Sequence, residues 1–196
     1  MVAATDGVES VYWNPAGLRS ITRPSAVFSY GTWPADISHQ FAAYAMRPGF
    51  IPGVVAISVT TLQMDPMTVR TADSPQGIGV EFDCGDIAVG VSYTRVFTDK
   101  FSAGFTLNYL HMGLAETAVN TGSLDFGIMY RIGIKDLKLG MTIQHLGGSF
   151  TFDERESRLP VTFKVGASFV PIHTDNHKLL FAAEFSHPSD NKERAN

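Results

Sequence analysis

Four charged residues are the strongest candidates for chemistry in this sequence: Asp125, Lys138, Lys164 and Glu184. Each stands in a stretch where apolar residues alternate with small or polar ones, on the small or polar side of the alternation. Side chains placed in this way project from one face of a sheet, so opposite charges on different strands could form ion pairs. Alternatively, they line a polar channel or hold another segment of the chain.

Signals for catalysis and metal binding are missing from the sequence. It lacks the motifs of serine hydrolases, zinc proteases, P-loop enzymes and dinucleotide-binding enzymes. The six histidines have no convincing metal-ligand spacing, and the single cysteine, Cys84, cannot form an internal disulfide or a multi-cysteine metal site. We therefore expect a protein that is not an enzyme and has no metal or cofactor.

The composition indicates an all-β chain. Glycine occurs 18 times and phenylalanine 14 times, and charged residues make up only 17% of the 196 positions. No stretch approaches the roughly 18 to 20 consecutive apolar residues that a membrane-spanning helix needs. The net charge of -4 comes without a basic cluster, so nucleic-acid binding is not expected.

A two-residue period predicts the strands that would position the four charges. Between 87 and 94, for example, Ile, Val, Val and Tyr alternate with Ala, Gly, Ser and Thr. Such alternation is typical of a sheet whose two faces meet different surroundings. About nine strands are expected, at 25–30, 37–46, 54–62, 87–94, 101–109, 123–130, 137–144, 162–169 and 179–186.

The connections between these strands alternate in length. Outer-membrane barrels have this pattern, with tight periplasmic turns and longer outer loops, and only the brief outer connection at 31–36 departs from it. A soluble β-sandwich is the alternative, but its outward face is usually rich in charge, whereas the non-apolar face here is rich in Gly, Ala, Ser and Thr. The short connections are 47–52, 98–100, 133–136 and 171–177, and the long ones are 63–85, 112–122 and 147–159.

The first twenty residues do not have the pattern of a strand. The segment DGVESVYWNPAGLRS, at 6–20, indicates a short helical turn followed by an Asn-Pro turn and a nearby glycine. It resembles the amino-terminal signature of the FadL-like superfamily, in which an acidic stretch, an aromatic residue and NPAGL precede the first barrel strand. The residues that carry this motif are Asp6, Tyr12, Trp13, Asn14, Pro15, Ala16, Gly17 and Leu18.

Within that superfamily, the chain most resembles the PorV/PorQ group. The spelling VYWNPAGL is followed in order by DIAVGVSYTRVFTDKFSAGFTLNYL, DFGIMYRIG, LKLGMTIQHLG and LPVTFKVGASF, and the likeness covers nearly the whole chain. The resemblance implies a fourteen-stranded antiparallel transmembrane β-barrel whose amino-terminal segment folds into the lumen as a hatch.

Two regions follow from this resemblance. Residues 1–22 are expected to form an incomplete hatch or plug, and residues 23–196 the barrel strands, with the carboxyl-terminal strands missing. About nine strands of a probable fourteen, and an odd number, imply an incomplete barrel. Its bare edges could not be satisfied in lipid, so this piece alone is not expected to insert stably. The four charged residues would then face the lumen.

The resemblance to PorV implies residence in the bacterial outer membrane and a role in type IX protein secretion, as a shuttle or surface anchor for exported cargo. The expected partners are outer-membrane lipid and secreted cargo proteins or other secretion-system components. The first alternative is FadL-like transport of hydrophobic small molecules across the outer membrane. The second is a soluble β-sheet interaction module, which the scarcity of surface charge disfavours.

Overall fold

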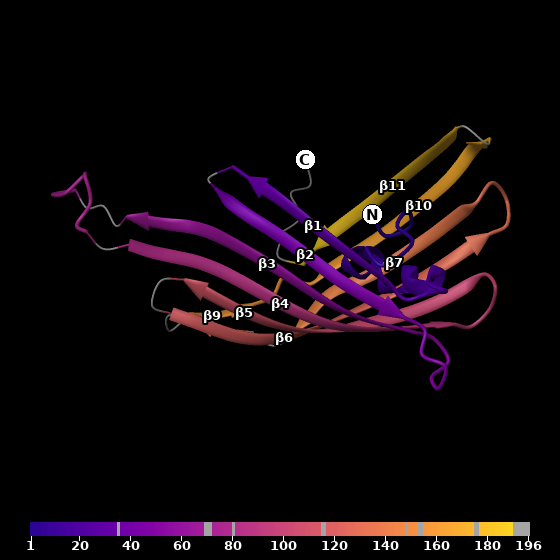
Figure 1. Ribbon diagram of the computed structural model, residues 1–196, viewed down its shortest axis with the longest axis horizontal. Helices are drawn as coiled ribbons and strands as arrows, with labels where there is room; N and C mark the ends of the chain where they lie inside the picture. The colour runs from indigo at the N-terminus through magenta and orange to yellow at the C-terminus, as the bar shows by residue number, and fades with distance from the viewer. Residues whose placement is uncertain are drawn as a thin grey trace.

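The computed structural model describes residues 1–34, 36–68, 72–79, 81–114, 117–147, 149–152, 155–174 and 177–189. They form one curved sheet of nine strands, a two-stranded hairpin and a helical segment at the amino terminus (Figure 1). The helical elements are α1 (Ser10–Trp13) and the 3-10 helix η1 (Pro15–Ser20). The strands are β1 (Ser25–Trp33), β2 (Ile37–Met46), β3 (Val54–Thr68), β4 (Glu81–Val96), β5 (Phe101–Leu114), β6 (Thr117–Ile132), β7 (Leu137–Gly147), β8 (Ser149–Phe152), β9 (Arg155–Arg158), β10 (Thr162–His173) and β11 (Lys178–Pro188).

The nine-stranded sheet follows the order of the chain, with every pair antiparallel. Its order is β1-β2-β3-β4-β5-β6-β7-β10-β11, and the hairpin β8-β9 is inserted between β7 and β10. The all-β, antiparallel prediction and the nine expected strands are therefore confirmed. The hairpin was missed, because its second strand is the charged stretch RESR, which has no apolar alternation.

The predicted lengths of two connections are wrong. The supposed loop 112–122 is mostly strand, because β5 and β6 pair as far as Leu114↔Thr117. The supposed loop 63–85 is likewise shortened, since β3 and β4 pair as far as Thr68↔Glu81. Along most of these extensions the strands pair without the two-residue apolar period that predicts the other strands. In Figure 1, β3 and β4 accordingly reach far toward the left end of the molecule.

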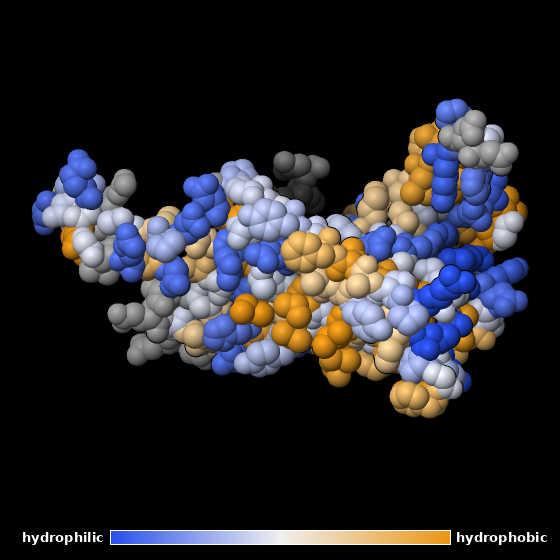
Figure 2. All heavy atoms as spheres, viewed as in Figure 1, coloured by the Kyte–Doolittle hydropathy of each residue, from blue (hydrophilic) through white to orange (hydrophobic). Residues whose placement is uncertain are grey.

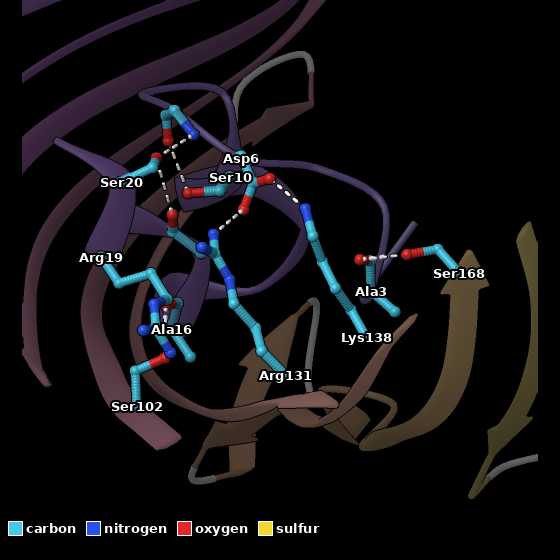
Figure 3. A network of polar contacts seen from close by, with 12 residues as sticks. Ala3, Asp6, Ser10, Ala16, Arg19, Ser20, Ser102, Arg131, Lys138 and Ser168 are labelled. Carbon is cyan, nitrogen blue, oxygen red and sulfur yellow. Dashed lines mark hydrogen bonds and ion pairs between the residues drawn. The ribbon is translucent and has the colours of Figure 1, made fainter. Parts of the chain in front are cut away.

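The sheet is not closed. Among the described residues, β1 pairs only with β2 and β11 only with β10, so the sheet has two free edges. Its strands curve around the amino-terminal segment, which lies on the concave side (Figures 1 and 3). The observed architecture is thus an open, barrel-like wall with a segment of its own chain on the inner side.

The two faces of the sheet differ in polarity in the predicted way. Small and polar side chains of the central strands point to the concave face and are buried, as Ser92, Thr106 and Thr142 illustrate. Large apolar side chains point to the convex face and are exposed, as Val91 and Leu107 illustrate, each 55% accessible. The larger apolar residues are therefore mostly on the exposed face.

A compact apolar core lies between the amino-terminal segment and one part of the sheet. The residues that form it are Val8, Val11, Leu18 and Ile21 from the segment, and Phe41, Ala43, Ala45, Val54 and Ala56 from β2 and β3. Burial of these side chains stabilises the packing of the segment against the sheet. The free-energy gain is about 25 cal/mol for each Å² of apolar surface removed from water.

Among the described residues, no helix is long and apolar enough to cross a membrane.

Candidate functional site on the concave face

The amino-terminal segment turns sharply at Asn14. Asn14 has extended backbone angles (φ -159, ψ 107), which suit a residue that precedes proline. Its side-chain oxygen accepts a hydrogen bond from Ala16 N at 3.0 Å, and Pro15 occupies the first position of η1, where no backbone donor is needed. The Asn-Pro pair of the motif therefore ends α1 and starts η1.

The side-chain amide of Asn14 also ties the segment together and to the sheet. Its nitrogen donates to Val2 O at 2.8 Å and to Ile128 O of β6 at 3.1 Å, and the residue is fully buried. With the bond from Ala16, one buried side chain forms hydrogen bonds with three backbone groups. This explains why the motif needs an asparagine here.

Hydroxyl groups of the sheet donate to further backbone carbonyls of the segment. Thr94 of β4 donates to Pro15 O at 2.5 Å, and Ser102 of β5 donates to Ala16 O at 3.0 Å. On the far side, Ser168 of β10 donates to Ala3 O at 2.7 Å (Figure 3). The small polar residues of the alternation are thus the hydrogen-bond donors that hold a non-strand backbone against the sheet.

Glycines allow the close approach that these bonds require. A Cβ atom at Gly127 would collide with the Asn14 side chain, and one at Gly140 would collide with Val2 O. Within the segment, a Cβ at Gly17 would lie 2.6 Å from Ser10 Cβ and 2.8 Å from Thr5 O. The glycine of NPAGL is therefore required by packing inside the segment, and the two sheet glycines by packing beneath it.

An ionic cluster holds the start of the segment. Asp6 accepts from Arg131 Nη2 of β6 at 3.1 Å and forms an ion pair with Lys138 of β7, and Figure 3 shows its carboxylate between the two cations. Arg19 donates to Asp99 O at 2.6 Å. Burial, and then repulsion by Arg131, lower the pKa of Arg19 from its usual value.

All four charged residues predicted from the sequence lie on the concave face, but no two of them pair with each other. Lys138 binds Asp6, and Glu184 accepts from Val2 N at 2.7 Å, so these two hold the segment. Asp125 and Lys164 instead bind neutral partners. The expectation of ion pairs among the four is therefore wrong, because the segment lies between the strands and supplies the partners of Lys138 and Glu184.

Asp125 and Lys164 belong to a second polar group, farther along the concave face. Asp125 is only 8% exposed and accepts from Asn108 Nδ2 at 2.8 Å and from the backbone N of His145 at 2.7 Å. Lys164 Nζ donates to Gln144 Oε1 at 2.8 Å. These groups line a cavity of about 250 Å³ whose other wall includes Tyr12.

The eight residues of the amino-terminal motif have different surroundings. Residues from Asn14 to Leu18 are buried, whereas Tyr12 and Trp13 are 44% and 38% exposed. The Tyr12 ring meets Trp13, His39 and Phe41 edge to face, with centroids 5.1, 6.2 and 5.5 Å away. Sequence reasoning missed Arg131, although its odd-numbered position on β6 places it on the same face as Asp125.

Within the part of the chain that the structure describes, no group of three or more His, Cys, Asp or Glu side chains is arranged to hold a metal ion. Comparison of the sequence with known protein families gives no matching family, and comparison with curated proteins gives no similar sequence.

Proposed function

We propose that this chain forms part of the wall of a bacterial outer-membrane β-barrel that resembles PorV and serves protein secretion as a surface anchor or shuttle for exported cargo. The observation that carries the proposal is the polarity of the sheet: the larger apolar side chains mostly point outward from the convex face, and the small and polar ones point inward. A protein surrounded by water has the reverse arrangement, whereas a barrel surrounded by lipid requires this one.

The extent of the apolar face supports a membrane environment. Phe28 on β1 is 69% exposed, Tyr109 on β5 55% and Phe185 on β11 64%, so the face spans the sheet from one edge to the other. Figure 2 shows apolar side chains across the middle of the visible face and hydrophilic residues at the left end. Contiguous apolar surface of this kind marks a contact with lipid or with another protein.

The length of the strands fits the same environment. A strand tilted by about 45° crosses a bilayer with roughly 9 to 11 residues. β4, with 16 residues, and β5, with 14, exceed that length and would extend beyond the hydrocarbon layer at one end. Because lipid leaves no partner for backbone groups, the proposal requires further strands to pair with β1 and β11.

The concave face favours a barrel plugged by its amino-terminal segment over a conduit for apolar substrates. The amino-terminal segment is held by buried hydrogen bonds, ion pairs and an apolar core, and the cavity beside it is lined largely by Ser, Thr, Asn, Asp, Gln and Lys. A route for hydrophobic molecules would have to be apolar, since unpaired polar groups repel them. The lining therefore supports the anchoring role more than FadL-like transport.

Cell fractionation of the native protein tests the proposal. It should remain with the outer membrane, migrate differently on gels before and after boiling, and crosslink to an exported protein. Recovery in a soluble fraction would reject the membrane assignment. Outer-membrane residence without any exported partner, combined with uptake of fatty acids, would reject the anchoring role and favour transport.

A further inference from the structure

The cavity beside the amino-terminal segment has a polar wall and a second wall, the aromatic wall, which carries two aromatic rings together with Ser58 and Thr60. It holds about 250 Å³, slightly below the roughly 300 to 1,000 Å³ of typical ligand pockets, so it suits a small ligand. The polar wall comes from β5, β6, β7 and β10, and the other from α1, β2, β3 and β4. The lining side chains that matter here are Tyr12, Phe41, Asn108, Asp125, Gln144 and Lys164.

A β-bulge shapes the polar wall. The register between β6 and β7 shifts between Leu124 and Phe126, and opposite it His145 has a φ of 61°, which is unusual for a residue other than glycine. The bulge frees the backbone N–H of His145, and the Asp125 carboxylate accepts it at 2.7 Å. Bulges commonly redirect side chains beside binding sites, and this one fixes Asp125 at the cavity wall.

The aromatic wall leaves one ring within reach of a ligand. Tyr12 is 44% exposed although it contacts Phe41, which is itself only 6% exposed. The rings of Trp13 and His39 also contact the Tyr12 ring, from other sides. The Tyr12 ring is therefore fixed in position and accessible, which limits the entropy lost when a ligand packs against it.

The charges of the wall restrict the class of ligand. The charged side chains that line the cavity are Asp125 and Lys164, which sum to zero. A ligand with a single charge would be attracted by one of them but repelled by the other, and an apolar ligand would bury both without replacing their water. A neutral molecule with several hydroxyl groups can donate to the carboxylate, accept from the ammonium and pack its C–H surface against the tyrosine ring.

From this arrangement we infer that the cavity between Tyr12 and the polar wall at Asp125 and Lys164 binds a neutral hydroxylated small molecule of the sugar type. The inference goes beyond cargo anchoring and rests on the cavity alone. Asn108 and Gln144 add amide groups that both donate and accept, as hydroxyl-rich ligands require.

Binding of glucose to the full chain tests the inference. The protein should be held in micelles of a detergent without a sugar headgroup, and glucose, phosphocholine and octanoate should be compared by saturation-transfer NMR. We expect saturable binding of glucose and none of the two charged probes. Saturable binding of either charged probe in place of glucose, or no saturable glucose binding by the folded chain, would overturn it.

Matched variants locate the binding. Tyr12→Ala should weaken glucose binding about tenfold, and Tyr12→Phe should keep it within about twofold, because the ring is retained. The control is Tyr44→Ala, which removes a tyrosine of nearly equal exposure, 43%, from the convex face and should change nothing.

A second variant keeps the test valid if Tyr12→Ala does not fold. Lys164→Ala removes a partly exposed donor of the polar wall and should also weaken glucose binding about tenfold. Unchanged glucose binding in Lys164→Ala, or in a folded Tyr12→Ala, would place any binding elsewhere and overturn the assignment. None of these measurements depends on cargo capture or on fractionation. Failure of the glucose-binding inference can therefore be distinguished from failure of the proposed function.

Discussion

The convex and concave faces of the sheet use side chains in opposite ways. On the convex face, large apolar residues such as Leu107 and Phe126 are exposed. On the concave face, glycine, serine and threonine pack against the backbone of residues 1–21. The concave face therefore has its partner within the chain, whereas the large apolar side chains of the convex face are left exposed among the described residues.

The largest effect should come from the concave side. Leu18 is fully buried in the core of the segment, so Leu18→Ala should lower the free energy of unfolding by about 2 to 5 kcal/mol. Urea unfolding in detergent measures this change in the free energy of unfolding. The control is Leu107→Ala, the same change at a residue 55% exposed, which should stay within about 0.5 kcal/mol. Equal effects at the two positions would erase the distinction between the faces.

A charge on the convex face should be costly only in lipid. Leu107→Lys should destabilise the protein in bilayers by about 2 to 4 kcal/mol if the residue lies near the middle of the membrane. Ile134→Lys, in the turn 133–136, should cost about 0 to 1 kcal/mol, because a turn of the proposed barrel would lie at the membrane interface. Refolding of the native protein, with the further strands that the proposal requires, into vesicles compares the two variants, and equal costs would argue against a lipid-facing band.

Loss of the Asn14 amide should have a smaller effect. Asn14→Ala leaves Val2 O, Ile128 O and Ala16 N without this partner, and should cost about 1 to 3 kcal/mol. Limited proteolysis should then release residues 1–21 before the strands are cut. The control Asn120→Ala changes an exposed asparagine of β6. Equal protection of the segment in both variants would show that apolar contacts alone hold it.

The smallest effect is expected at Asp6. Its pairs with Arg131 and Lys138 are partly exposed, with 33% of the Asp6 side chain accessible, so Asp6→Asn should cost about 1 kcal/mol or less. Salt screens such pairs, so the difference from the unaltered chain should shrink in about 1 M salt. Unfolding at low and high salt measures this, and a difference that does not change with salt would show that the pairs contribute little.

The predictable part of this protein was the part that repeats along the chain. Alternation placed the nine strands and identified which residues share a face, since a strand carries its side chains to opposite sides in turn. It failed at Asn120 and Glu81, where ladder pairs continue without an apolar period. It also failed for β9, whose four residues are all polar.

The candidate site was predictable only as a set of residues. The motif around Asn14 and the charge of Lys138 were both identified, but their relation was not, because Asp6 and Lys138 are 132 positions apart in the chain. Arg131 could have been found from its odd-numbered position on β6, which it shares with Asp125. The cavity at Tyr12 could not, since it depends on where the segment turns within the curved sheet.

By itself, the sequence determined the antiparallel strands, their faces and the sharp turn at Asn14-Pro15, because these depend on neighbours within a few residues. The sheet hydroxyls that satisfy the carbonyls of the segment, and the contacts of Val2 with Glu184 and of Asp6 with Arg131 and Lys138 that hold its start, could be seen only in the tertiary structure. Such pairings depend on the curvature and register of the whole sheet, which local patterns do not encode.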